Sequence, residues 1–431
     1  MLGAFVNAFR TPDLRRKLLF VLGIIVIFRL GSQLPAPGVN VANVQDCVAQ
    51  VQNDGIYGLI NLFSGGALLQ LTVFALGIMP YITASIILQL LVVVIPRLET
   101  LKKEGQAGQT KITQYTRYLT LALAILQATG IVALARADQL IQGCALPLLY
   151  DEGIATMLIM VITMTAGTAI IMWFGELITD RGIGNGMSIL IFTQVVATFP
   201  ATLWALRQDR GWAVFGMVIL IGFVIIAVVI FMEQGQRRIP VQYARRMVGR
   251  KMYGGSSTYI PLKVNQAGII PVIFASSLLY LPALATQFDP NQDNPVSSFL
   301  GKYFTTGDHP LYMAVYFAMI VFFTYFYVSI TFNPTEVADN MKKYGGFIPG
   351  IRAGKPTEEY LSYVLSRITL PGATYLGLIA LIPLIALVLV DANQNFPFGG
   401  TSILIMVGVA LDTVKQIESQ LQQRNYEGFL R

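Results

Sequence analysis

Charged residues are scarce in this sequence. Asp, Glu, Lys and Arg together make up 12% of its 431 residues, whereas soluble globular domains contain about 25%. Hydrophobic residues reach 55%, and the mean hydropathy is +0.62. These proportions exclude an ordinary soluble domain and predict an integral membrane protein. Residues 1–17 are not expected to be a cleavable leader, because the apolar run from Leu18 is long enough for a full span.

Residues that carry catalysis are equally rare. A single histidine, His309, leaves little scope for imidazole chemistry, and there is no HExxH motif, nucleophile elbow or P-loop. The glycines of segment 182–186 resemble a dinucleotide loop only superficially, since they follow no strand and open a membrane span. We therefore expect neither an enzyme nor a cofactor. Without a nucleotide site, any energy for transport has to come from a partner or from the membrane potential.

Only two cysteines are present, Cys47 and Cys144. Both fall in loops predicted to be external, which is the side of the membrane where a disulfide can persist. An even number on one side allows a bridge. However, a large membrane-embedded core needs no such staple, and this favours two separate free thiols.

The longest uncharged stretch runs from Ile56 to Pro96. A continuous helix of that length would extend roughly 60 Å, at about 1.5 Å per residue, whereas the hydrocarbon core is about 30 Å thick. Tilt cannot absorb a factor of about two, so the segment must be broken, and Gly65-Gly66 supplies the break. A short apolar half-helix that does not cross the membrane needs a cavity inside the protein.

Hydropathy and charge together predict the topology. Of the 30 lysines and arginines, 25 fall on one side of the membrane if the N-terminus is placed in the cytoplasm, so both termini are expected there. Ten spans are predicted, near residues 18–35, 73–95, 115–135, 154–174, 183–203, 213–232, 266–286, 311–332, 369–390 and 399–416.

Ten spans divide into five and five, and halves with an odd number of spans must be inverted relative to each other if they share a fold. We expect an N-terminal half at 1–203, a C-terminal half at 204–416 and a cytoplasmic tail at 417–431. The loops 233–265 and 333–368 are long, basic and interspersed with aromatic residues and turns. They predict a structured docking platform for RNA-rich or acidic partners, although the positive-inside bias alone is an alternative explanation.

Several long stretches closely resemble the SecY family, the channel subunits of the bacterial general secretory translocon. The resemblance is collinear and covers nearly the whole chain; its clearest stretches are 74–91, 175–192, 237–251, 257–277 and 333–361. It implies an all-α polytopic membrane protein with ten transmembrane helices, in two inverted five-helix halves around a central hourglass pore with a plug half-helix. A secondary transporter is the alternative class, but no predicted span carries the central acid that ion coupling usually needs.

The resemblance implies a constriction of aliphatic side chains and a plug that closes it. A narrow apolar collar excludes ions by dewetting, yet offers a passing peptide no fixed hydrogen bond. Met187 departs from the family's usual isoleucine. The ring carries over to Ile78, Ile82, Met187, Ile191, Ile273 and Ile405. The plug carries over to the segment from residue 60 to residue 71, centred on Ser64, Gly65 and Gly66. Its site residues are Ile60, Asn61, Leu62, Phe63, Ser64, Gly65, Gly66, Ala67, Leu68 and Leu69.

A lateral gate between the second and seventh spans is implied as well. Thr83 and Leu281 match facing positions of that gate, although the family often has a bulky aromatic residue in place of Leu281. Gln89 and Asn265 are candidate polar groups on the same seam, with ordinary packing between helices as the alternative for each. The positions matching the family's contacts with the motor ATPase SecA and with the ribosome are Arg237, Arg238, Arg245, Arg246, Arg250, Lys251, Arg352 and Lys355.

The partners implied are the subunits SecE and SecG, SecA, the translating ribosome, signal sequences and nascent membrane proteins, and the lipid bilayer. SecDF and a YidC-type insertase are further candidates. The implied location is the bacterial plasma membrane.

Overall fold

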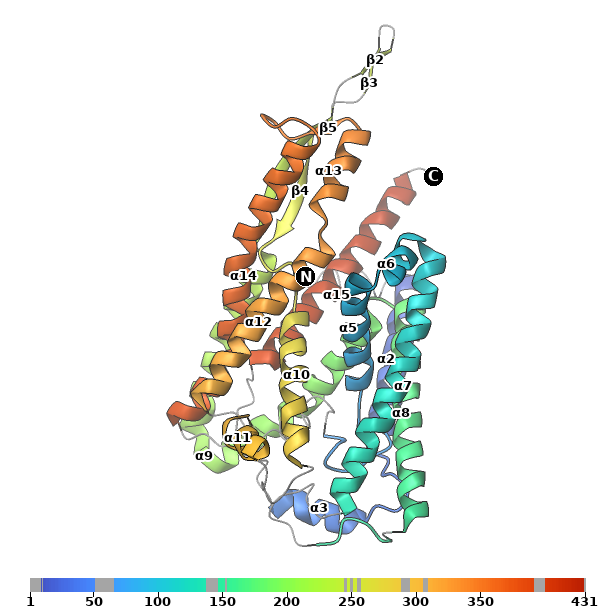
Figure 1. The fold of residues 1–431 in the computed structure, drawn as a ribbon, viewed down its shortest axis with the longest axis vertical. Helices are drawn as coiled ribbons and strands as arrows, with labels where there is room; N and C mark the ends of the chain where they lie inside the picture. Colours follow the sequence, from blue (N-terminus) through green and yellow to red (C-terminus); the bar gives the residue numbers. More distant parts are fainter. Residues whose placement is uncertain are drawn as a thin grey trace.

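The computed structural model describes residues 9, 11–50, 66–136, 146–151, 153–243, 246–248, 251–253, 257–287, 295–304, 309–390 and 400–429. The described part is mainly helical, and its long helices run roughly side by side (Figure 1).

The first group of helices is α2 (Pro12–Gly31), α3 (Val41–Gln50), α5 (Met79–Val94), α6 (Pro96–Lys103), α7 (Gln106–Arg136) and α8 (Ile154–Arg181). A proline in the first turn starts α2, α5 and α6, where its missing N–H costs nothing. Helix α7 packs between α5 and α8. The bend between α5 and α6 is 100°, at Pro96, which ends one helix and begins the next.

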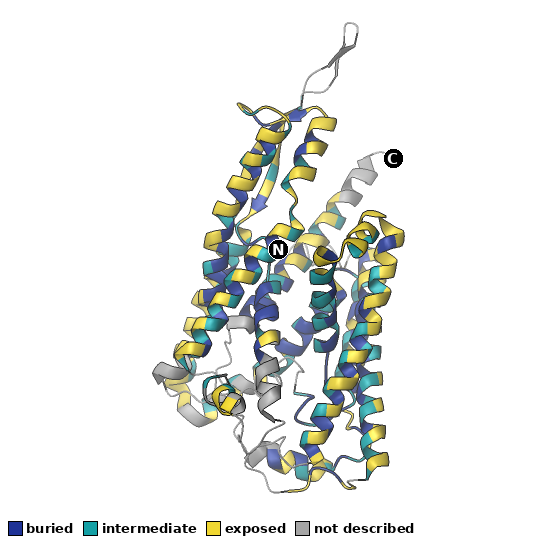
Figure 2. Ribbon diagram, viewed as in Figure 1, coloured by how far each residue is buried: buried dark blue, intermediate teal, exposed yellow. Residues whose placement is uncertain are grey.

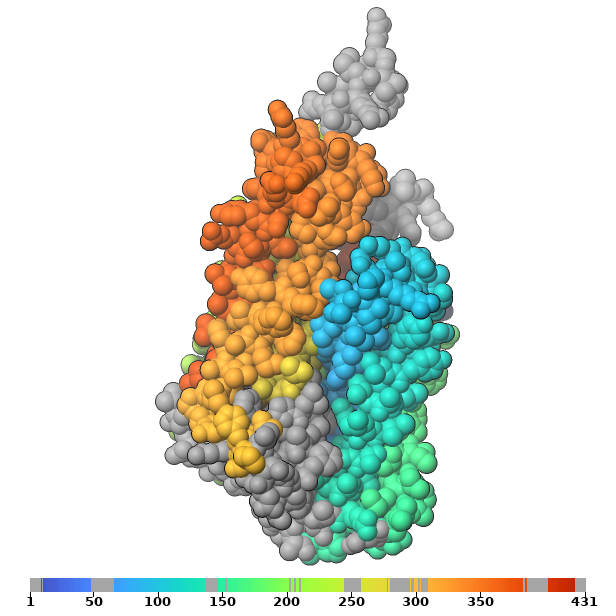
Figure 3. All heavy atoms as spheres, viewed as in Figure 1, coloured from blue at the N-terminus to red at the C-terminus, as the bar shows by residue number. Residues whose placement is uncertain are grey.

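The second group is α9 (Gly186–Gln234), α10 (Ile270–Gln287), α11 (Pro295–Phe304), α12 (Pro310–Thr331), α13 (Pro334–Lys343), α14 (Lys355–Val390) and α15 (Gly400–Phe429). Helix α12 packs against α10 and α14, and α15 packs against α9. The two groups face each other along a seam that runs through the molecule, with α5 to α8 on one side and α10, α12 and α14 on the other (Figures 1 and 3).

Helix α9 contains two of the predicted spans. Its backbone breaks at Gly211, where φ is 78° and ψ is −178°, a conformation that only glycine adopts easily. The part before the break includes the apolar helix Gly186–Pro200, and the part after it is Gly211–Gln234.

Among the described residues, five helices are long and apolar enough to cross a membrane, or six if the bent pair α5 and α6 counts as one span. Each of the ten predicted spans overlaps a helix. The long helices carry exposed apolar side chains such as Phe223 and Phe231, and buried residues concentrate on the faces turned inward (Figure 2). A protein with this distribution is surrounded by lipid, where exposed apolar side chains cost nothing.

The second span begins later than predicted. Residues 73–78 form turns and α5 starts at Met79. The preceding residues Gly66–Leu71 also form turns in place of the end of the expected half-helix, because Gly66 (φ 88°) and Leu71 (φ 49°) adopt left-handed backbone conformations. An antiparallel bridge between Pro35 and Thr72 then holds this segment beside the end of α2.

The two long basic loops come together in one small sheet. Strand β1 (Gln236–Tyr243) pairs antiparallel with β4 (Ser257–Lys263), and at its end also with β5 (Gly346–Phe347). Two short strands, β2 (Arg246–Val248) and β3 (Lys251–Tyr253), form a hairpin at the far tip. We call β1, β4, β5, α13 and the start of α14 the basic platform. It has a core of its own, which includes Ile239, Val241, Leu262 and Leu361. The prediction of structured loops is confirmed.

Candidate channel, gate and docking surface

The six side chains expected to form the pore ring lie in a single apolar cluster. Ile78, Ile191, Ile273 and Ile405 are buried in it, and Ile82 and Met187 pack against it. They come from the start of α5, from α9, from α10 and from α15, so both groups of helices contribute. We call these six residues the collar.

Local contacts fix the part of the collar on α9. Asn185 caps the helix by accepting a hydrogen bond from the backbone N of Met187 at 3.0 Å, which satisfies a donor that the helix leaves open. One turn separates Met187 from Ile191, so both lie on one face. Gly175 of α8 lies under Met187, where an added Cβ would be 2.4 Å from its sulfur. A larger residue at position 175 would therefore have to displace the thioether of Met187.

The described part of the expected plug lies beside the collar and belongs to a different cluster. Ala67, Leu68 and Leu69 are buried, and the two leucines pack with residues of α3, α7 and α8. The remaining plug positions, Ile60 to Gly65, lie outside the described residues. Phe74, just after the plug, joins the collar's cluster and stacks on Phe28 of α2 with the ring centroids 5.9 Å apart. The chain therefore runs from the plug directly into the collar.

The expectation of two free thiols is wrong. Cys47 is fully buried in α3 and is disulfide-bonded, and no described cysteine is free. Cys144, the one other cysteine of the sequence, lies outside the described residues. The segment that follows it packs on the start of α3: Asn40 N donates to Leu148 O at 2.9 Å, and Asn43 Nδ2 donates to Pro147 O at 2.9 Å. This packing brings two segments distant in sequence together, which the sequence argument did not foresee.

The expected gate helices α5 and α10 contact each other, and the seam between the two groups of helices passes between them (Figure 3). Thr83 donates its hydroxyl to Met79 O within α5 at 3.0 Å. Gln89 is exposed, and Leu281 lies in α10, where its side chain is outside the described part. Among the described residues, no hydrogen bond crosses this seam between the gate positions.

Asn265 has partners in its own half of the molecule. Its side-chain nitrogen donates to the carboxylate of Glu233 at the end of α9, and to Gly268 O at 3.2 Å. The two candidate polar groups of the seam therefore share no hydrogen bond: Asn265 ties the segment before α10 to the end of α9, and Gln89 is exposed. Nearby, Lys263 Nζ lies 3.7 Å from Asp412 Oδ1 of α15. Sequence reasoning missed Glu233, although an acidic residue at the end of an apolar span was a visible signal.

A second ion pair joins two helices of the first group. Arg117 of α7 binds Glu176 of α8 through two hydrogen bonds of 2.8 Å each, the bidentate geometry that suits a guanidinium and a carboxylate. The sequence alone does not show that these two side chains are partners. The pair fixes α7 against α8 near the basic end of the molecule.

The expected docking residues that the structure describes lie on the basic platform and its tip. Arg237, Arg238, Arg352 and Lys355 are exposed; the guanidinium of Arg238 lies 4.9 Å from the ring centre of Tyr259. Arg246 and Lys251 lie in the tip strands β2 and β3, whereas Arg245 and Arg250 fall outside the described residues. Arg352 sits in the turn between β5 and α14, where its carbonyl accepts a hydrogen bond from Thr357 Oγ1 at 2.8 Å.

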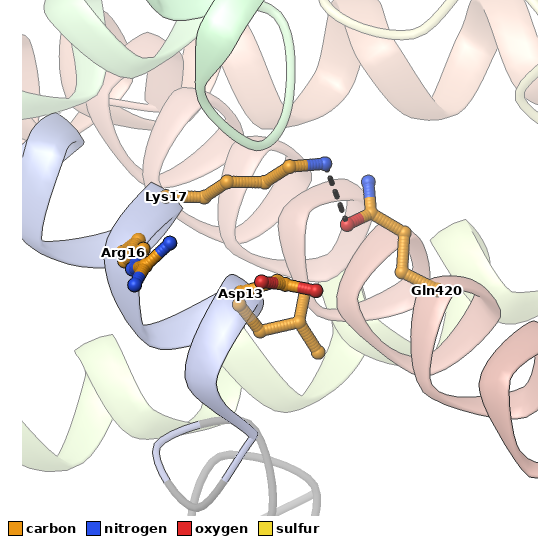
Figure 4. A pocket seen from close by; sticks show the side chains of 5 residues that line it. Asp13, Arg16, Lys17 and Gln420 are labelled. Atoms are coloured by element: carbon orange, nitrogen blue, oxygen red, sulfur yellow. Dashed lines mark hydrogen bonds between the residues drawn. The ribbon is translucent and has the colours of Figure 1, made fainter.

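A shallow cavity opens between the start of α2 and the last turns of α15. It is lined by Asp13, Leu14, Arg16, Lys17 and Gln420, and Lys17 Nζ donates to Gln420 Oε1 at 3.5 Å (Figure 4). The long hydrogen bond joins the N-terminal and C-terminal helices. Among the described residues, no group of three or more His, Cys, Asp or Glu side chains could hold a metal ion.

Comparisons with known proteins agree with this geometry. The SecY family model matches residues 72–414. The protein translocase subunit SecY of Streptomyces griseus is 68% identical over 438 residues, covering 100% of both chains. The protein of the same name from Mycobacterium tuberculosis is 62% identical over 441 residues, also covering 100% of both chains.

Solved structures show the same fold. A structure described as a protein conducting channel superposes with a TM-score of 0.63 at 20% identity, over 94% of this chain and 91% of the other. Sec61 from a canine ribosome–channel complex of the endoplasmic reticulum gives 0.60 at 18% identity, over the same shares. The fold is thus that of a multi-pass, protein-conducting membrane channel. The chain belongs to the SecY family.

Proposed function

We propose that this chain forms the protein-conducting channel of a bacterial secretory translocon. It passes unfolded preproteins across the membrane and releases transmembrane helices sideways into the lipid. The observation that carries the proposal is the collar, in which six apolar side chains from four helices, drawn from both groups, meet in one cluster. Such a constriction resists ions by dewetting and can widen around a peptide, because its contacts are side-chain packing without directional bonds.

The plug and the seam complete this mechanism. The segment 60–71 seals the channel from beside the collar when no substrate is present. The seam between α5 and α10 opens as the lateral gate, with Thr83, Gln89, Asn265 and Leu281 along it. The absence of hydrogen bonds between these gate positions, among the described residues, supports an opening that a substrate helix can drive by its own contacts with the gate.

The chain is a passive channel, and its energy comes from SecA, the ribosome or the proton-motive force. The exposed arginines of the basic platform supply the docking surface, because guanidinium groups bind carboxylates and phosphates in bidentate fashion. SecE and SecG complete the translocon; SecDF and a YidC-type insertase are further partners.

The protein lies in the bacterial plasma membrane with both termini in the cytoplasm. Its two halves, 1–203 and 204–416, are inverted repeats followed by the tail 417–431. The boundary falls within α9, a few residues before the backbone break at Gly211.

A secondary transporter is disfavoured. Ion-coupled carriers usually hold ionisable groups at membrane depth, and no Asp, Glu, Lys, Arg or His side chain is buried among the described residues.

Site-specific photocrosslinking tests the channel. A photoreactive amino acid is placed at Ile273 or Ile405 in the collar, and at Phe223 as the control, whose side chain is 69% exposed on the lipid side of α9. A secretory protein stalled during translocation should crosslink to the two collar positions and not to Phe223. Equal crosslinking at all three positions, or none in the collar, would refute the proposed path.

A further inference from the structure

The turn between the two parts of α9 holds an arginine between two tryptophans. The guanidinium carbon of Arg207 lies 4.3 Å from the ring centre of Trp204 and 4.0 Å from that of Trp212. Trp204 is one helical turn before Arg207, so the two side chains share a face. Trp212 comes after the break at Gly211, whose backbone (φ 78°) reverses the chain and brings the second indole back against the guanidinium.

This arrangement holds the guanidinium in one orientation. Each of the two indoles lies within cation–π distance of the guanidinium, and such a contact stabilises the cation by about 0.5–1 kcal/mol at exposed sites. Because the stacking occupies the faces of the planar group, the N–H donors along its edge stay available. Among the described residues, Arg207 has no carboxylate partner. An oriented guanidinium with a free edge is suited to bidentate binding of a phosphate.

The position of the stack corresponds to the membrane surface. It lies where one apolar helix ends at the turn and the highly apolar helix Gly211–Gln234 begins. Both indoles are largely exposed, Trp204 by 57% and Trp212 by 68%, although tryptophans in a protein core are mostly buried. Exposed tryptophans at the ends of membrane spans lie at the level of the lipid headgroups. The phosphates of the lipids are therefore at the same depth as the edge of Arg207.

We propose that Trp204, Arg207 and Trp212 form a binding site for the phosphate of an anionic phospholipid, at the end of the molecule opposite the basic platform. The guanidinium edge binds the phosphate, and the exposed indole surfaces pack on the glycerol and upper acyl chain. The sequence of the turn supports this charge preference, since it contains Arg207 and Arg210 against the single acid Asp209. A lipid fixed here would hold the turn that joins the two parts of α9.

Tryptophan fluorescence offers a direct test, because the chain has only three tryptophans. Substituting the third, Trp173→Phe, leaves Trp204 and Trp212 as the only reporters. The full chain, with tryptophan-free versions of any co-purifying subunits, is reconstituted in vesicles that mix phosphatidylcholine with phosphatidylglycerol. One of the two lipids carries bromine on its acyl chains and quenches indoles that it contacts.

We expect brominated phosphatidylglycerol to quench several-fold more effectively than brominated phosphatidylcholine at equal mole fraction. Arg207→Gln should remove this preference, and Arg207→Lys should weaken it, since the charge remains but the planar edge is lost. Arg136→Gln is the matched control, because it removes an arginine at the end of α7 whose guanidinium donates to Met157 Sδ at 3.8 Å. Thermal unfolding of each variant verifies that the turn is still folded.

Three results would overturn the proposal. Equal quenching by the two lipids would show that the stack only closes the turn. An unchanged preference in a folded Arg207→Gln protein would place the lipid elsewhere. Loss of the preference in millimolar inorganic phosphate would identify free phosphate as the ligand in place of a lipid. A preference that survives phosphate and needs Arg207 supports the lipid site.

Discussion

The collar and the basic platform both join distant parts of the chain, but different forces hold them together. The collar consists of apolar side chains from α5, α9, α10 and α15 that touch without hydrogen bonds between them. The platform is held by a continuous antiparallel ladder between β1 and β4, from Gln236–Lys263 to Gln242–Ser257. It also has its own buried core. Its strands and helices all come from the part of the chain that begins at Gln236.

The difference indicates which part can change shape. Apolar packing is non-directional, so the collar can exchange its contacts for those of a peptide at little cost. The ladder's hydrogen bonds and core resist such exchange, because a buried donor or acceptor left unpaired costs about 1–3 kcal/mol. We infer that the platform moves as one body and transmits force from a docked partner to α10 and α14, while the collar adapts to the passing chain.

The largest expected effect is on the platform's turn. Arg352→Glu should block ATP-driven secretion in reconstituted vesicles while leaving the protein folded and inserted, because an exposed guanidinium at a turn tip is replaced by a charge that repels acidic partners. Lys343→Glu is the control, since Lys343 is also exposed on the platform but lies at the end of α13. Normal translocation by Arg352→Glu vesicles, with unchanged binding of SecA, would contradict the docking role.

The next largest effect is expected from a substitution that leaves a cavity in the platform core. Leu262→Ala should destabilise the platform by about 2–5 kcal/mol, since Leu262 is fully buried there. If the two regions are independent, partner binding falls while resting ion conductance stays at the wild-type level. Thr258→Ala, at an exposed position of the same strand, should change neither. A conductance increase in Leu262→Ala would show that the platform helps to seal the collar, so that the two regions are not independent.

A change in the collar is expected to raise resting ion conductance, which the change in the platform core should leave unaltered. Ile405→Asn places a polar group in the constriction, which lowers the dewetting barrier and weakens the apolar packing of the collar. Because open and closed states differ by only a few kcal/mol, we expect roughly a tenfold shift towards the open state. Planar-bilayer recordings should show raised resting conductance, and export of proteins with defective signal sequences should increase.

Ile403→Asn provides a matched control for this change. Ile403 is an equally buried isoleucine of the same helix, but it belongs to the cluster formed with α10, α12 and α14. It should lower stability without raising conductance. Equal leaks from both variants would mean that loosening α15 anywhere opens the channel, and the six collar positions would lose their special role.

The sequence predicted what depends on composition and on local pattern. The ten predicted spans overlap helices, and Ile78, Ile273 and Ile405 were expected together and lie in one cluster. What it could not predict depends on pairing between distant residues. The β1–β5 contact joins residues about a hundred positions apart, and the buried disulfide of Cys47 follows from how the external segments pack.

The gate positions show most clearly that the sequence does not predict which distant side chains pair. The sequence marks Gln89 and Asn265 as candidate polar groups on the seam, with ordinary packing between helices as the alternative for each. Which partner they find is decided by helix rotation, and the sequence does not fix that. The structure exposes Gln89 and pairs Asn265 with Glu233.

The smallest expected effect is the loss of one hydrogen bond at Asn265. A double-mutant cycle tests whether Asn265 interacts with Glu233 of its own half or with Gln89 across the seam. Asn265→Leu and Glu233→Ala should couple by about 0.6–2 kcal/mol, as measured for polar contacts between membrane helices, because each variant removes the same hydrogen bond. Asn265→Leu and Gln89→Leu should be additive, since these side chains do not meet. Unfolding equilibria in mixed micelles provide the free energies. A coupling with Gln89 as large as that with Glu233 would mean that a polar contact does cross the seam. The gate would then be held by a directional hydrogen bond, whereas the collar is held by apolar packing alone.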